Sequence, residues 1–242
     1  MRDWRAETEK RAEFIRGALK AANASGVVFG NSGGKDSALV GILCKKACDN
    51  TVGLIMPCGS KRNYGLDKTD AEIVGGKFGI ACRTVDLTGV RDGLMNAVAA
   101  SPCVIPPPAA ANIAPRLRMA ALYAVAASEN RLVAGTGNRS EAYMGYFTKW
   151  GDGAHDFNPI SDLTVTEIFE FLRYLGAPAF LLTKAPSAGL FDGQTDESEM
   201  GVTYDAIDNF LLQGKASERD KAVIERHHKA TEHKRKPIVT FS

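Results

Sequence analysis

The sequence has few features of a secreted, membrane-spanning or nucleic-acid-binding protein. Its 242 residues include five cysteines, an odd number without paired Cys-x-x-Cys spacing, so neither a disulfide framework nor a zinc site is predicted. No apolar run is long enough to span a bilayer, and the charged N-terminus lacks the apolar core of a signal peptide. A net charge of +2 gives no general attraction to nucleic acid or to membranes. We therefore expect a reduced, cytoplasmic protein without a nucleic-acid or membrane partner.

Short apolar strands alternate with amphipathic helices over the first 135 residues. Runs such as GVVFG and TVGLIM end at a glycine or a proline, as buried strands do. Such alternation predicts right-handed crossovers and a parallel sheet, with ligands bound beyond the carboxyl ends of the strands. We expect an α/β fold: a three-layer, doubly wound parallel sheet with helices on both faces. The expected strands are 26–30, 51–56, 81–87 and 131–135, and the expected helices are 4–24, 37–47, 67–79 (capped by Asp67), 89–100 and 111–130.

The pattern is looser in the second half of the chain. After about residue 148 it predicts a helix at 164–175, a long loop at 183–203 and two more helices, which we interpret as an appendage of the sheet. The proline-rich stretch 101–110 predicts an exposed connection or a loop that contacts a partner. Loops as long as 183–203 are usually functional or disordered in compact domains. Because this loop is rich in glycine and acidic residues, we expect a lid that excludes water from a site.

The stretch FGNSGGKDSALVG, residues 29–41, has the composition of a phosphate-binding loop. A strand, a glycine-rich turn and a helix start bring backbone N–H groups and the helix dipole together on an anion. The loop is not a Walker A sequence, because that motif needs glycine where Phe29 stands and serine or threonine where Asp36 stands. It does not contain the dinucleotide-binding G-x-G-x-x-G pattern either.

The acidic residue Asp36 indicates what the loop binds. A carboxylate inside a phosphate cradle repels the phosphate unless a divalent cation bridges the two groups. Mg²⁺ is commonly held by one or two carboxylates together with phosphate oxygens. The loop therefore predicts a magnesium–polyphosphate site, although a plain helix entry with Asp36 in the first turn is the alternative.

The segment SGGKDS, residues 32–37, resembles the pyrophosphate loop of the N-type ATP pyrophosphatases, which release pyrophosphate from ATP and transfer AMP. Four later blocks are similar to the ammonia-dependent NAD synthetases. This resemblance extends from the loop to residue 237 and implies an adenine nucleotide α-hydrolase-like fold. The four blocks are NIAPRLRMAALYAVA (112–126), VAGTGNRSEAYMGYFTKWGDGAHDFNPISDL (133–163), KAPSAGLFDGQTDESEMGVTYDAIDNFL (184–211) and TEHKRKP (231–237).

The resemblance implies a ligase that forms a C–N bond. The nicotinate carboxylate of deamido-NAD attacks the α-phosphate of ATP and releases pyrophosphate, and ammonia then attacks the acyl-adenylate to give NAD and AMP. It also implies a homodimer with deamido-NAD near the subunit boundary, for which the proline-rich loop and the apolar segment MAALYAVAA are candidate contacts. With about 25 residues before the first strand, we expect a single NAD synthetase domain, residues 1–242, without a glutaminase domain.

The same resemblance assigns roles to individual residues. Arg116, Lys149, Asp156, His233 and Lys234 match positions that bind deamido-NAD. Asp36 and Glu141 match the ligands of Mg²⁺. The residues that match ATP-binding positions are Gly30, Asn31, Ser32, Gly33, Gly34, Lys35, Asp36, Ser37, Thr136 and Ser187.

One position departs from the family pattern. Relatives usually carry a phosphate-contacting lysine where this chain has Val165. Lys35 is a candidate replacement, the alternative being that its side chain points into solvent. Thr164 and Glu167 still form a predicted capping box, so the helix start is kept.

Two other functions stay open on the residues alone. The first is an ATP pyrophosphatase that adenylates a different acceptor, such as a tRNA base, although an enzyme that binds tRNA would need a basic surface. A nucleotide-binding relative without catalysis is the other, and Val165 is the feature that favours it.

Overall fold

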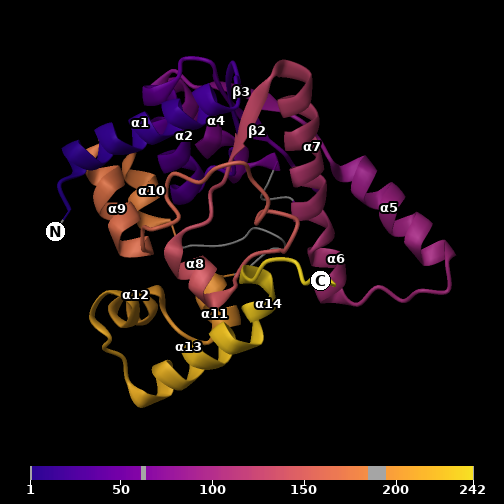
Figure 1. Ribbon diagram of the computed structural model, residues 1–242. Coiled ribbons are helices and arrows are strands. Elements are labelled where there is room, and N and C mark those ends of the chain that lie inside the picture. The colour runs from indigo at the N-terminus through magenta and orange to yellow at the C-terminus, as the bar shows by residue number, and fades with distance from the viewer. Residues whose placement is uncertain (1, 61–63, 185–194, 242) are drawn as a thin grey trace.

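The computed structural model describes residues 2–60, 64–184 and 195–241. The chain forms a four-stranded sheet in the order β3-β2-β1-β4, in which every neighbouring pair is parallel. The sheet lies toward the top of the view in Figure 1, where β2 and β3 are labelled. The strands are β1 (Gly26–Gly30), β2 (Thr51–Ile55), β3 (Ala81–Thr84) and β4 (Arg131–Ala134). The chain therefore crosses over from β1 to β2 to β3 and then returns to the far side of β1. The predicted parallel sheet is confirmed.

Helices cover both faces of the sheet, as predicted. Val27 and Phe29 of β1 face one core, which is shared with α1 (Trp4–Ala21), α2 (Lys35–Ala47), α9 (Val165–Tyr174) and α10 (Ala179–Thr183). Val28 faces the opposite core, where α7 (Ile113–Glu129) supplies most of the helical contacts. Successive strand residues point to opposite faces, so one short apolar strand serves two cores.

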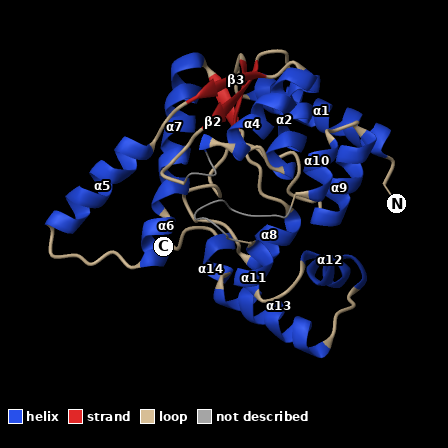
Figure 2. Cartoon of the chain, turned by 180° about the vertical axis from the view of Figure 1, so that it is seen from behind, coloured by secondary structure: helices blue, strands red, loops and turns tan. Residues whose placement is uncertain are grey.

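The second half of the chain adds a smaller helical layer next to the sheet. It consists of α8 (Arg139–Met144), α11 (Asp196–Met200), α12 (Tyr204–Gln213), α13 (Glu218–Ala230) and α14 (Glu232–Arg235). Its buried side chains include Met144, Val165, Tyr204 and Ile224. Figure 2 shows these helices below the carboxyl ends of the strands. The loop expected at 183–203 is thus partly helical, because α11 forms within it.

Several predicted boundaries were wrong. Asp67 does not cap α4 (Leu66–Phe78); it lies in the first turn and pairs with Lys184. Residues 107–111 form the short helix α6 (Pro107–Ala111), so the proline-rich stretch is a connection only in part. Proline suits a first helical turn because its missing N–H has no acceptor there. Strand β3 ends at Thr84, three residues earlier than predicted.

Helix α5 (Thr88–Ala100) projects from the body of the molecule (Figure 1). None of its residues is buried, although Val90, Leu94 and Val98 recur at helical spacing. Val90 is 54% exposed and Leu94 is 41% exposed. Among the described residues, no helix is both long and apolar enough to cross a membrane.

Candidate functional site

A cavity of about 620 Å³ opens at the carboxyl ends of β1, β2 and β4. The loop after β1 forms one wall, and Ile55 and Met56 at the end of β2 form another. Further lining residues come from the start of α7, the segment 133–154, α11 and Lys234 of α14. The site therefore lies where a parallel sheet is expected to bind its ligand.

The loop between β1 and α2 has the geometry of an anion cradle. Gly33 has φ +70, and a Cβ atom built there would lie 2.3 Å from the carbonyl oxygen of Asp67. Ser32 Oγ lies 3.1 Å from Ser37 Oγ and accepts a 3.3 Å hydrogen bond from the Gly34 N–H. Gly34 caps α2 without a side-chain partner, so the first N–H groups of the helix are available for a bound anion.

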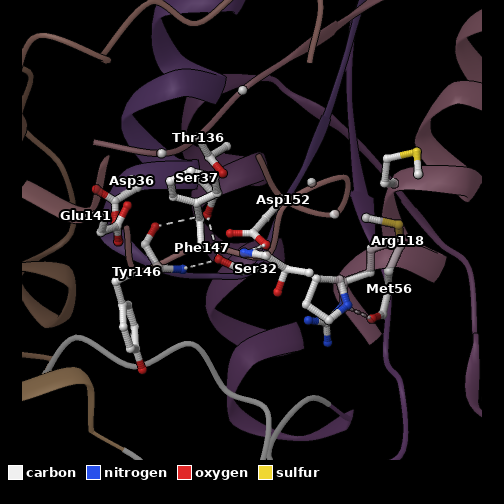
Figure 3. Close-up of a pocket in the computed structure, with 18 of the residues that line it drawn as sticks. Ser32, Asp36, Ser37, Met56, Arg118, Thr136, Glu141, Tyr146, Phe147 and Asp152 are labelled. Carbon is white, nitrogen blue, oxygen red and sulfur yellow. Dashed lines mark hydrogen bonds between the residues drawn. The ribbon is translucent and has the colours of Figure 1, made fainter. Parts of the chain in front are cut away.

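Asp36 and Glu141 lie side by side at the edge of this loop (Figure 3). Asn138 links them: its Nδ2 donates to Asp36 Oδ1 over 3.1 Å, and its backbone N–H donates to Glu141 Oε2 over 3.0 Å. Asn138 is also the N-cap of α8 in a capping box with Glu141. Burial, reinforced by repulsion from Asp36, raises the pKa of Glu141 well above its ordinary value.

This pair of carboxylates fits a divalent cation that also binds phosphate. Oxygen ligands are those that Mg²⁺ prefers, and Mg²⁺ commonly takes one or two protein carboxylates and completes its shell with phosphates and water. A cation here would also relieve the repulsion between the two groups. Within the described residues, no group of three or more His, Cys, Asp or Glu side chains forms a closed metal cage.

Lys35 does not point into solvent. The residue is 7% exposed, and its Nζ lies 2.7 Å from Asp36 Oδ2. The ammonium group also lies over the ring of Tyr204, 5.5 Å from the ring centre. Val165 and Tyr204 belong to one buried apolar cluster, so Lys35 lies against the edge of the cluster that contains Val165.

The end of the cavity opposite the loop holds polar groups that the sequence did not single out. Arg118 of α7 donates from Nε to the carbonyl oxygen of Met56 over 3.1 Å, and Asp152 lies between this arginine and the loop (Figure 3). Burial lowers the pKa of Arg118, and the negative charge of Asp152 opposes that shift. Burial raises the pKa of Asp152, while the Thr148 N–H at 2.9 Å and the charge of Lys234 act the other way.

A partly buried ion-pair network supports the loop where it meets α4. Lys184 Nζ lies 3.0 Å from Asp67 Oδ1 and 2.6 Å from Asp70 Oδ2, and it donates to the Gly33 carbonyl oxygen over 3.4 Å. The helix start of α4 is thereby tied both to the loop and to the end of α10. The spacing of these residues in the sequence gave no signal of this contact.

The predicted site residues divide into three groups. All of residues 30–37 except Gly33 line the cavity, together with Thr136, Glu141 and Lys234. Ser187 lies outside the described residues, as do residues 185–194 of the predicted lid. The other four predicted positions, Arg116, Lys149, Asp156 and His233, lie beside the cavity and not in its lining.

Three of those four form one patch at the surface. Arg116 donates from Nη2 to the Lys149 carbonyl oxygen over 3.3 Å, and Lys149 Nζ donates to the His233 carbonyl oxygen over 2.8 Å. Asp156 belongs to the sheet edge instead, because its Oδ2 accepts from the Val133 N–H over 2.7 Å and its Oδ1 accepts from the Tyr123 hydroxyl over 3.1 Å.

Comparison with known proteins identifies the family. The model of the family described as NAD synthase matches residues 7–239. The NH(3)-dependent NAD(+) synthetase of Carboxydothermus hydrogenoformans is 46% identical over 236 residues, which cover 97% of this chain and 96% of that protein. That of Finegoldia magna is 42% identical over 234 residues, which cover 96% of this chain and 94% of that protein.

Solved structures agree with this assignment. An NMN synthetase from Francisella tularensis superposes with a TM-score of 0.93 at 36% identity, covering 99% of both chains. An NH3-dependent NAD synthetase from Campylobacter jejuni superposes with a TM-score of 0.80 at 30% identity, covering 100% of both chains. The resemblance noted in the sequence is confirmed, and this chain belongs to the NAD synthase family.

Proposed function

We propose that this protein joins ammonia to the nicotinate carboxylate of deamido-NAD, converting ATP to AMP and pyrophosphate and forming NAD. Its family membership and its NH(3)-dependent relatives support this reaction. The observation that carries the proposal is structural: the anion-binding loop and the pair Asp36 and Glu141 open into one cavity whose other end presents Arg118 and Lys234. Such a cavity suits a polyphosphate at one end and an acidic second substrate at the other.

The protein's part in this chemistry is to position groups and neutralise charge. The carboxylate and ammonia are themselves the nucleophiles, so no serine or cysteine nucleophile is required. Backbone N–H groups of residues 32–37 bind the departing pyrophosphate, and Lys184 holds that loop in place. Asp36 and Glu141 would hold Mg²⁺, which supplies positive charge to the phosphate oxygens. Arg118, Asp152 and Lys234 orient the second substrate.

The test is a product assay with ATP, Mg²⁺, ammonium and deamido-NAD. We expect AMP, pyrophosphate and NAD in equal amounts, and loss of all three products with Asp36→Asn. The control Asp205→Asn changes an exposed carboxylate on α12 and should leave the yields unchanged. AMP without NAD would indicate a different acceptor, and the absence of both products would indicate a binding protein.

A second candidate substrate is nicotinate mononucleotide. The solved structure with a TM-score of 0.93 is described as an NMN synthetase, whereas two described as NAD synthetases have TM-scores of 0.80 and 0.78. The amidated carboxylate is the same in both substrates, so the choice depends on whether the site requires the adenylate half. Running the assay with each substrate in turn, and comparing kcat/KM, decides between them.

We further propose that the working unit is a homodimer assembled through α5. Helix α5 contacts α7 of its own chain, but Val90 and Leu94 on its apolar face are both exposed. A second copy offers the same face, as a two-fold interface requires. The contact expected from MAALYAVAA is not needed, because α7 packs part of that segment against the sheet. The single-domain organisation, the use of free ammonia and the cytoplasmic location stay predictions.

A further inference from the structure

The side chain of Lys35 forms an ion pair with one carboxylate and lies near two more. Its ammonium contacts Asp36 at 2.7 Å, and the carboxylates of Glu141 and Asp196 are close enough to act on it electrostatically. Asp196, from α11, is itself buried and accepts a 3.1 Å hydrogen bond from the Tyr204 hydroxyl. Three acidic side chains from separate parts of the chain thus gather around one lysine.

Lys35 is therefore held as a cation inside the protein. The 2.7 Å ion pair with the Asp36 carboxylate favours the charged form of the Lys35 side chain. Its position over the face of Tyr204 adds a cation–π contact. A neutral side chain at position 35 would leave the Asp36 carboxylate without its ion-pair partner.

The same carboxylates are the groups that fit a divalent cation when ATP is bound. Asp36 Oδ1 is already occupied by the Asn138 amide, so Oδ2, which Lys35 holds, is the oxygen that a metal ion would take most directly. A lysine ammonium and a metal ion repel each other strongly at such short separation in a partly buried site. The two cations therefore compete for this oxygen.

We propose that Lys35 is a built-in counter-ion that occupies the Asp36 oxygen until a divalent cation arrives with the nucleotide, and that the displaced ammonium then binds the polyphosphate. This inference rests on the proposed function for the identity of the metal-bearing ligand. Lys35 lines the same cavity as the loop and the carboxylates of Asp36 and Glu141, so its displaced side chain stays within reach of a bound polyphosphate.

Binding of Mn²⁺ alone, without nucleotide, tests the competition. Mn²⁺ accepts the same oxygen ligands as Mg²⁺, and the loss of its free electron paramagnetic resonance signal reports binding. We expect Lys35→Met to bind Mn²⁺ at least about tenfold more tightly than the wild-type protein, because the competing ammonium is gone. Lys35→Arg, which keeps the charge, should bind as weakly as the wild type. Lys45→Met is the matched control, since Lys45 lies on the same helix and pairs with Asp49 at the surface.

Thermal unfolding supplies a second measurement. Without metal, Lys35→Met should unfold at a lower temperature than the wild type, and millimolar Mg²⁺ should raise its Tm by more than it raises that of the wild type or of Lys45→Met. Equal Mn²⁺ affinity in Lys35→Met and the wild type would overturn the proposal, as would the absence of Mn²⁺ binding in every variant. Both measurements are independent of product formation, so an enzyme that made no NAD would fail the proposed function without deciding this inference.

Discussion

At the scale of single residues, Gly33 shows how closely the loop is fitted to the structure behind it. Its φ of +70 is a conformation that residues with a side chain rarely adopt. The nearest atoms to a built Cβ belong to Asp67 and Asp70, the two carboxylates that pair with Lys184. The loop thus packs directly against α4, and its other side, with the backbone N–H groups, faces the cavity.

Gly33→Ala is therefore expected to impair the loop strongly. A strained backbone costs about 1–3 kcal/mol by itself, and the clash with the Asp67 carbonyl adds to it. We expect a lower free energy of unfolding in urea and at least about tenfold weaker ATP binding by calorimetry. Gly76→Ala is the control: Gly76 is an exposed helical residue with no atom within 4 Å of a built Cβ, so the change should be neutral or slightly stabilising. Normal ATP affinity in Gly33→Ala would contradict the cradle role.

At the scale of elements, the buried carboxylate of Asp208 ties three helices together. Its Oδ1 accepts from the Ser140 hydroxyl of α8, and its Oδ2 accepts from both the N–H and the hydroxyl of Thr166 over 2.7 Å. Thr166 lies in the first turn of α9, where a negative charge is also favoured by the helix dipole. Since α8 carries Glu141, the position of that carboxylate depends on a residue of α12.

Asp208→Asn tests this link between elements. The amide keeps the shape of the side chain, but its N–H₂ group cannot accept the hydrogen bonds that Ser140 or Thr166 donates. One or two charge-assisted hydrogen bonds are therefore lost. Each is worth about 1.5–3 kcal/mol, and we expect the free energy of unfolding to fall by about that amount. The kcat should fall more than KM changes, because Glu141 is displaced while the rest of the cavity stays intact. A variant with lower stability but an unchanged kcat would show that Asp208 supports the fold alone.

At the scale of the whole molecule, the question that α5 raises is whether the helix is stabilised within one chain or by contact with a second copy. A helix with an apolar stripe and no buried residue gains little stability from its own chain, since most helical stability comes from packing. If α5 forms the two-fold contact proposed above, the projecting arm in Figure 1 is half of an interface. Three predicted deamido-NAD contacts lie beside the cavity at the surface: Arg116, Lys149 and His233. They can contact deamido-NAD only if the bound ligand extends out of the cavity.

The double variant Val90→Asp, Leu94→Asp should convert a dimer into a monomer. Placing two carboxylates on the apolar face introduces charges that the interface would have to desolvate. Sedimentation velocity should give twice the chain mass of 25.9 kDa for the wild type and 25.9 kDa for the variant. The control Leu212→Asp alters a comparably exposed leucine, 46% accessible, on α12. A monomeric wild-type protein would contradict the assembly proposed through α5.

The elements near the loop could be predicted because their signals are local. A short apolar run, a glycine-rich turn and a helical repeat are properties of neighbouring residues, so β1, the loop and α2 follow from their own sequence. The acidic residue within the turn also indicated a metal–phosphate site without any tertiary information. The helices α8, α10 and α11 were missed because each spans only five or six residues, too few for a periodic pattern.

The arrangement of side chains around the cavity was decided by tertiary packing. Arg116 and Arg118 stand two positions apart on α7 and so point to different sides of that helix. Which of them faces the cavity depends on how α7 lies on the sheet, and the structure places Arg118 inside and Arg116 outside. Lys35 likewise could face solvent or the interior on its sequence alone. The sequence thus determined the fold, the loop chemistry and the family, whereas the contacts between distant segments were decided by the docking of helices, because side-chain direction depends on orientation in space and not on order in the chain.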